Sequence, residues 1–312
     1  MNSPFFDRLP RRFPIRLPKT RSGRVALSLA VVYFVWGSTY MGVHVALGSF
    51  PPLLLSGLRN LFAGIGLFVF AVRRKPNAWP TLLEVRNAAM VGTMLVGLSS
   101  GLLAFGMRTV GTGMAAVMVA TVPLFATVIA AVAGRQITKA EWSAVALGLV
   151  GIVALNHGDS SASSAGGTLA ILGGALFWAG GAHLAGRLRM PSDLFMSTSL
   201  QVGLGGGLST LLAWLLGERM SDLAFGPAFA FLYLVLIGTM AAYVAYGYLI
   251  RHTSPIIASS CMYVNPIVAV AIGALLLGEP VTRWTVIATG LILASVGLSF
   301  YFDRRRVAAR AD

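Results

Sequence analysis

The chain alternates between long apolar segments and short polar connections. The apolar segments have roughly the twenty residues that an α-helix needs to cross a hydrocarbon core about 30 Å thick. Within each segment the residues run apolar, without the alternation of a transmembrane β-strand. The pattern predicts an all-α integral membrane protein with ten transmembrane helices. They cover residues 25–47, 51–72, 87–107, 109–133, 140–156, 168–187, 192–216, 226–250, 254–277 and 283–302.

Basic residues divide unequally between the two sides of this topology. If the N-terminus is cytoplasmic, twenty of the 24 lysines and arginines fall on the inner side. Arg108, Arg219 and Arg283 fall on the outer side, and Arg59 lies within the second segment. Because cytoplasmic loops of membrane proteins carry the excess of Lys and Arg, both termini are expected in the cytoplasm.

The amino-acid composition agrees with a membrane protein and disfavours a soluble or nucleic-acid-binding protein. The chain is 56% hydrophobic and 11% charged, whereas soluble domains carry about 25% charged residues. Its net charge of +14 lies in tails and short loops, where it orients helices beside anionic lipid, and no nucleic-acid-binding motif accompanies it. The single cysteine, Cys261, has no partner for a disulfide or a CxxC motif. We expect no cofactor, no metal and no nucleic-acid partner, and the oligomeric state is left open.

A polar, Gly/Ser-rich stretch in the middle divides the chain into two halves of five segments each. The halves match in order at an offset of about 142 to 144 residues: Arg59 aligns with Gln201, and Arg108 with Arg251. The predicted parts are a disordered basic tail (1–24), a first repeat (25–157), a linker (158–167), a second repeat (168–302) and a basic tail (303–312).

The number of segments in each half is odd, so the second half enters the membrane inverted. Inverted repeats are typical of secondary transporters, whose substrate site lies near the bilayer midplane between the halves. The repeat therefore favours a transporter working by alternating access. The alternative is a membrane-embedded sensor or structural module without transport.

Arg59 is the candidate site residue with the sharpest physical rationale. A charge inside a membrane helix costs about 2.5–3.5 kcal/mol on insertion scales and is a functional candidate by default. One interpretation is that Arg59 attracts an anionic group of the substrate, such as a carboxylate. The other is that it bonds helix carbonyls or an outer acid such as Glu218, Asp222 or Glu279.

Aromatic residues mark a second candidate feature. Trp36, Tyr40 and His44 recur four residues apart on the first segment, and Trp178 is the repeat counterpart of Trp36. Paired tryptophans at mid-membrane depth suit a cavity that stacks planar or cationic ligands. Helix packing with an interfacial aromatic belt is the other interpretation. His44 is a candidate proton carrier or, alternatively, a structural histidine.

Two prolines, Pro123 and Pro266, occupy equivalent mid-segment positions in the two halves. Each removes a backbone hydrogen bond, so we expect a pair of bent or broken helices whose freed carbonyls line the site. Polar and aromatic neighbours complete the set of candidate substrate-binding residues: Ser99, Tyr243, Tyr246, Tyr263 and Asn265.

The acidic residues and the missing motifs limit the mechanism. All ten Asp and Glu fall in tails, in loops or at segment edges, which disfavours coupling through a buried carboxylate. Transport is then facilitative, or coupling uses a histidine or Glu279. No Walker, HExxH or GxSxG motif occurs, so neither ATP hydrolysis nor enzymatic catalysis is expected.

Five short stretches carry a resemblance to a known family: Trp36–Tyr40, Phe50–Pro52, Arg59–Gly64, Val119–Phe125 and Gly278–Thr282. On these the chain resembles the EamA family of the drug/metabolite transporter superfamily, and within it the YedA-like exporters. The resemblance implies ten helices, two EamA repeats, an inner-membrane location and export of small metabolites or drugs. Met107 stands where YedA-like proteins often carry an acid, so no role of that acid transfers. Arg59 and the tryptophans together suit amino acids or amphipathic metabolites.

Overall fold

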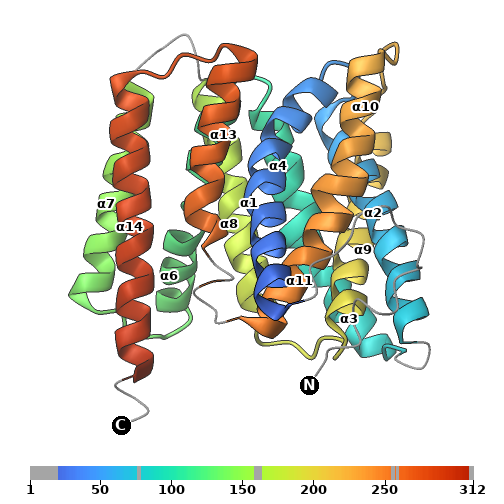
Figure 1. The fold of residues 1–312 in the computed structure, drawn as a ribbon, viewed down its shortest axis with the longest axis horizontal. Helices are drawn as coiled ribbons and strands as arrows, with labels where there is room; N and C mark the ends of the chain where they lie inside the picture. Colours follow the sequence, from blue (N-terminus) through green and yellow to red (C-terminus); the bar gives the residue numbers. More distant parts are fainter. Residues whose placement is uncertain (1–19, 76–78, 158–163, 254–256, 258–259, 309–312) are drawn as a thin grey trace.

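The computed structural model describes residues 20–75, 79–157, 164–253, 257 and 260–308, and these form a bundle of helices (Figure 1). The all-α class predicted from the sequence is thereby confirmed. The outer parts of both predicted tails (1–19 and 309–312) and most of the predicted linker (158–163) lie outside the described residues.

The helices follow the order of the apolar segments. Those of the first half are α1 (Arg21–Ala46), α2 (Pro52–Arg74), α3 (Leu82–Gly92), η1 (Thr93–Leu98), α4 (Ser99–Gly106), α5 (Thr112–Val119), α6 (Val122–Val132) and α7 (Lys139–His157). Those of the second half are α8 (Ala165–Ala185), α9 (Leu194–Leu215), α10 (Phe225–Tyr233), η2 (Leu234–Ala241), α11 (Ala242–His252), α13 (Cys261–Leu277) and α14 (Arg283–Ala308).

Seven helical stretches of the described chain are long and apolar enough to cross a membrane, which makes this a multi-pass membrane protein. Helix α13 is apolar but shorter, with 17 residues. The start of α1 and the end of α14 lie at the same end of the bundle (Figure 1). The count of ten spans and the cytoplasmic side of the termini stay predictions. The seven are Arg21–Ala46, Pro52–Arg74, Leu82–Gly106, Thr112–Val132, Ala165–Ala185, Phe225–His252 and Arg283–Phe302.

Several helices extend beyond the segments expected from hydropathy, as α8, α1 and α14 illustrate. Helix α8 begins at Ala165 instead of residue 168, because the Ser164 side chain caps it by accepting a hydrogen bond from the Gly167 N–H at 3.0 Å. Helix α1 begins at Arg21, where Thr20 caps it, and α14 continues to Ala308. Hydropathy marks the lipid-facing length of a helix, whereas capping and backbone bonding decide where the helix ends.

Two π-helical stretches, η1 and η2, interrupt otherwise continuous α-helices. Leu234 at the start of η2 lies 141 residues after Thr93 at the start of η1, close to the offset of the sequence repeat. In η2 the Thr239 hydroxyl donates to the Leu234 carbonyl, five residues earlier, at 2.9 Å. Such π-bulges are rare and are frequent at functional sites.

The two repeat-related prolines have different surroundings. The fourth predicted segment, 109–133, divides between Val119 and Val122 into α5 and α6. Pro123 is the second residue of α6, where a missing N–H costs no helical hydrogen bond. Pro266 lies inside α13, which continues through it, so of the expected bend or break the helix shows no break at this residue. It is only the sixth residue of that helix, so its ring disturbs only the first turns.

Helix pairing connects the halves. Helix α2 packs along α9, and α7 along α14 at one edge of the bundle (Figure 1). Helix α1 packs against α11 and α13, while its repeat counterpart α8 packs against α4 and α6. Where α2 crosses α9, a Cβ on Gly64 would overlap the backbone of Gly203, so only glycine allows this approach.

Candidate functional site

A cavity of about 270 Å³ lies within the bundle, lined by residues of α1, α2, η1 and α4 from the first half and of α8, η2, α11 and α13 from the second half. Helix α5 and the break after it complete the wall. Both halves of the chain thus supply equivalent elements. The predicted site residues that line it are Trp36, Tyr40, Arg59, Ser99, Trp178, Tyr243, Tyr246, Asn265 and Pro266.

Three predicted residues lie elsewhere. His44 is exposed, because eight residues of an α-helix advance about 80° beyond two full turns and carry it away from the face of Trp36. The Tyr263 ring packs 5.8 Å from that of Phe300 on α14. Pro123 follows Val122, the last residue of that stretch to reach the cavity.

Arg59 reaches the cavity from α2. It is the eighth residue of that helix, so it lies roughly 10 Å from the helix start at 1.5 Å per residue. Its Nε is buried and has no hydrogen-bond partner in the described part of the chain. A guanidinium carries five N–H donors and no acceptor, so Arg59, which lines the cavity, can donate to a ligand there.

The acids considered as partners of Arg59 are engaged at helix ends. Glu218 accepts hydrogen bonds from the N–H groups of Leu53 and Leu54 at the start of α2, at 3.4 and 2.8 Å. Glu279 accepts from Thr112 N–H at 2.6 Å and from Gly113 N–H at 3.1 Å at the start of α5. Both carboxylates therefore complement positive helix N-termini.

No hydrogen bond or ion pair joins Arg59 to a carboxylate or a main-chain carbonyl within the ranges that the structure covers. This includes Asp222, whose main-chain carbonyl accepts from the Ser49 hydroxyl at 2.9 Å. The interpretation of Arg59 as a residue satisfied by protein groups thus has no contact to support it.

An aromatic wall lies on the α1–α11 side of the cavity. The Trp36 ring centroid is 5.0 Å from that of Tyr246 and 5.9 Å from that of Tyr243, the latter in an edge-on arrangement. The hydroxyls of Tyr40, Tyr243 and Tyr246 make no hydrogen bond to any residue described by the structure. Trp178 reaches the cavity from α8 and packs against the buried cluster of Val122, Ala175 and Ala179. Large apolar faces and free hydroxyls thus surround the same space.

Sequence reasoning missed several lining residues. Thr39, Asn60 and Thr239 contribute polar groups, and Cys261 also lines the cavity. Asn60 was recognisable as the neighbour of Arg59, but Thr239 reaches the cavity through the π-helix η2, for which the sequence holds no signal. Asn265 ties α13 to α1 when its amide is turned so that the nitrogen faces the carbonyl oxygens of Cys261 and Tyr33, to each of which it then donates at 3.2 Å.

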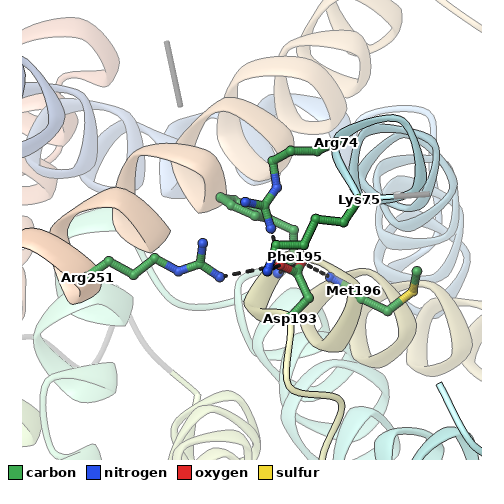
Figure 2. Close-up of polar contacts among 6 residues, drawn as sticks. All are labelled: Arg74, Lys75, Asp193, Phe195, Met196 and Arg251. Carbon is green, nitrogen blue, oxygen red and sulfur yellow. Dashed lines mark hydrogen bonds and ion pairs between the residues drawn. The ribbon is translucent and has the colours of Figure 1, made fainter. Parts of the chain in front are cut away.

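A charged cluster lies at the end of the bundle where α2 and α11 end and α9 begins (Figure 2). Asp193 caps α9 by accepting from the N–H groups of Phe195 and Met196 at 3.0 and 3.1 Å. Its carboxylate also pairs with Arg74 of α2 and lies 3.6 Å from Arg251 of α11. One carboxylate therefore connects three helices.

Burial disfavours the charged form of Asp193, yet its pKa is lowered overall. The hydrogen bonds from the Arg74 side chain and the Met196 N–H, together with the charges of Arg74 and Arg251, outweigh the cost of burial. Both guanidinium groups also lie over the Phe195 ring, at 4.8 and 5.2 Å from its centroid. The carboxylate is thus held ionised at neutral pH.

Comparisons with known proteins agree over most of the chain. A family model described as the EamA-like transporter family matches residues 23–156 and 165–301. A relative from Escherichia coli, described as the uncharacterized inner membrane transporter YedA, is 36% identical over 273 residues, which cover 87% of this chain and 89% of the relative. A relative from Salmonella typhimurium, described as a probable amino-acid metabolite efflux pump, is 26% identical over 306 residues, covering 94% and 99%. A solved crystal structure that is 15% identical has a TM-score of 0.62, covers 92% of this chain and 99% of its own, and shows the fold alone.

Proposed function

The chain belongs to the EamA-like transporter family, and we propose that it is a secondary transporter that exports small metabolites or drugs across the inner membrane by alternating access. The family match confirms the resemblance inferred from the sequence, and the function as a small-molecule membrane transporter follows from it. The export direction, the alternating-access mechanism and the ten-span topology are our proposals.

The observation that carries the proposal is the central cavity between equivalent elements of the two halves. Each half contributes one tryptophan, one π-helical stretch and the segment that follows that stretch. The family model also matches the chain as two consecutive stretches. A site shared by two inverted halves becomes accessible from either side when one half rocks against the other.

The proposed topology has ten spans in two inverted repeats with both termini in the cytoplasm. The charge asymmetry of the loops supports the orientation, and the common end of the bundle for α1 and α14 supports termini on one side. The described parts of the predicted repeats, 25–157 and 168–302, meet along the α2–α9 and α7–α14 pairs. The YedA relative, described as an inner membrane transporter, supports the location.

The proposed substrate is a small molecule. The protein uses no cofactor and changes no covalent bond of the substrate during transport. Amino acids and related metabolites are one class to test, since one relative is described as a probable amino-acid metabolite efflux pump. The competing function is a sensor or structural module that binds a solute without moving it.

The decisive experiment uses purified protein in liposomes loaded with a mixture of amino acids, aryl carboxylates, nucleosides and organic cations. Mass spectrometry of the external medium identifies any solute that leaves faster than from protein-free vesicles. A saturable, selective release supports transport. Binding of a solute in a thermal-shift assay without release from vesicles would favour the sensor and contradict export.

A further inference from the structure

The cavity wall has an unbalanced charge. Arg59 is the one charged side chain among the lining residues that the structure describes, and the lining has no aspartate or glutamate. An arginine stays protonated, and a charge at membrane depth is normally paired. The group that neutralises Arg59 is therefore absent from the protein wall.

Donors to an anion are gathered near that charge. The Arg59 Nε is buried and unpartnered, and the hydroxyls of Tyr40 and Tyr243 lie within electrostatic range of the guanidinium. These hydroxyls make no hydrogen bond to the part of the protein that is described. A guanidinium binds a carboxylate in a planar, bidentate arrangement, and phenol hydroxyls donate to carboxylate oxygens as well.

The rest of the wall suits an apolar body. Trp36, Trp178 and Tyr246 present aromatic faces, and Val43, Leu103 and Ile171 present aliphatic groups. The volume of about 270 Å³ lies near the lower limit of pockets that hold small ligands, roughly 300 Å³. The cavity thus accommodates one compact molecule.

From this arrangement we infer that the site selects small organic monocarboxylates with a planar or apolar body and without a charged ammonium group. This inference rests on the proposed transport function and names its substrate class. An α-ammonium group would find no carboxylate in the wall and would be repelled by Arg59. Amino acid zwitterions and organic cations are therefore bound more weakly than the matching anions.

A matched set of four compounds with one phenyl ring tests the charge preference: phenylacetate, its methyl ester, phenylalanine and phenethylamine. Binding to detergent-purified protein is measured by isothermal titration calorimetry. Wild type is compared with Arg59→Gln, with the charge-conserving Arg59→Lys, and with Arg219→Gln, which removes an exposed arginine. Thermal unfolding of each variant verifies that it is folded.

We expect phenylacetate to bind wild type more tightly than the other three compounds. Loss of a charge-assisted hydrogen-bonded contact should weaken its affinity about 10- to 100-fold in Arg59→Gln, less in Arg59→Lys and not in Arg219→Gln. The inference is overturned if phenylalanine or phenethylamine binds wild type at least as tightly as phenylacetate. It is also overturned if folded Arg59→Gln retains the wild-type affinity for phenylacetate.

The same compounds enclosed in proteoliposomes separate this inference from the proposed function. Release of phenylalanine without release of phenylacetate would contradict the anion-selective site but support the transport function. Tight, Arg59-dependent binding of phenylacetate without release would support the site and contradict transport. Selective release of phenylacetate that is lost in Arg59→Gln supports both.

Discussion

The Arg251 guanidinium lies 3.6 Å from the Asp193 carboxylate, joining the end of α11 to the start of α9. Arg74 approaches the same carboxylate from α2 (Figure 2). The repeat counterpart of Arg251, Arg108, is exposed and has no such acid beside it in the described chain. The two halves thus share a backbone pattern, but the equivalent arginines have different surroundings. Of these two, only Arg251 takes part in an ion-pair cluster among the described residues, and this cluster connects α2, α9 and α11.

Replacing Asp193 by asparagine should destabilise the protein by about 3–5 kcal/mol, the range seen when one partner of a buried pair is removed. The Asp193 side chain is 2% exposed, and the change leaves Arg74 and Arg251 without their anion. Asparagine still caps a helix, so the loss reports the charge. Thermal unfolding of purified protein measures it, with Asp222→Asn, at an exposed acid, as the control. An unchanged unfolding temperature would contradict a stabilising cluster.

The stability of wild type should also fall in acid because of Asp193. Its pKa is lowered in the folded state, so its contribution is complete above the unfolded pKa of about 3.9 and is lost as the pH falls through the lower folded value. Unfolding temperatures measured from neutral pH down to strong acid should therefore decline less steeply for Asp193→Asn than for wild type. Parallel curves for the two proteins would show that Asp193 does not titrate in this way.

The contact between α2 and α9 should tolerate no side chain at Gly64. Because a Cβ there would overlap the Gly203 backbone, Gly64→Val should prevent the helices from closing and greatly reduce the yield of folded protein. Gly207 on α9 is the control, since a Cβ there would meet only the end of the Leu61 side chain, at 3.8 Å. Gly207→Ala should be neutral or stabilising by up to about 1 kcal/mol. Size-exclusion chromatography and thermal unfolding compare the two, and a well-folded Gly64→Val would refute the tight crossing.

Trp36 should contribute to binding through its aromatic face. Trp36→Ala removes the ring beside Tyr243 and Tyr246 and should weaken binding of an aryl ligand by about tenfold, as for a stacked aromatic contact of 0.5–1.5 kcal/mol added to lost apolar burial. Trp79→Ala is the matched control, because Trp79 is 65% exposed and outside the cavity. Calorimetric titration with phenylacetate provides the measurement. Equal losses in both variants would assign Trp36 to packing alone.

Glu279 should act as a helix cap and take no part in proton coupling. The Thr112 and Gly113 N–H groups bond different oxygens of Glu279, so Glu279→Gln keeps an acceptor for only one of them. The variant should cost about 1–3 kcal/mol, because the other N–H is left unsatisfied and the charge at the start of α5 is lost. Glu279→Ala leaves both donors unsatisfied and should cost more. Solute release from proteoliposomes should keep its wild-type pH profile in Glu279→Gln. A flattened profile in a stable variant would instead identify Glu279 as the coupling group.

Most of the candidate site could be predicted from the sequence, because its charged, polar and aromatic residues lie within otherwise apolar segments. Arg59 is a charge where lipid-facing residues are expected, and Trp36 and Trp178 occupy equivalent places in the two repeats. His44 does not line the cavity, because residues spaced by four drift around the helix. Helix α13 does not break at Pro266, because a position so early in a helix tolerates proline.

The sequence by itself determined the helical class and the family, since segment length is dictated by bilayer thickness and the motifs are local. It also predicted the inverted halves. Only the tertiary structure decided which side chains meet in the cavity and that no protein acid satisfies Arg59 within the described residues. Thr239 lies within η2 and Tyr243 just after it, and the wider π-helical turn changes which of these side chains face the cavity. Such a change depends on packing between distant helices and leaves no trace in hydropathy.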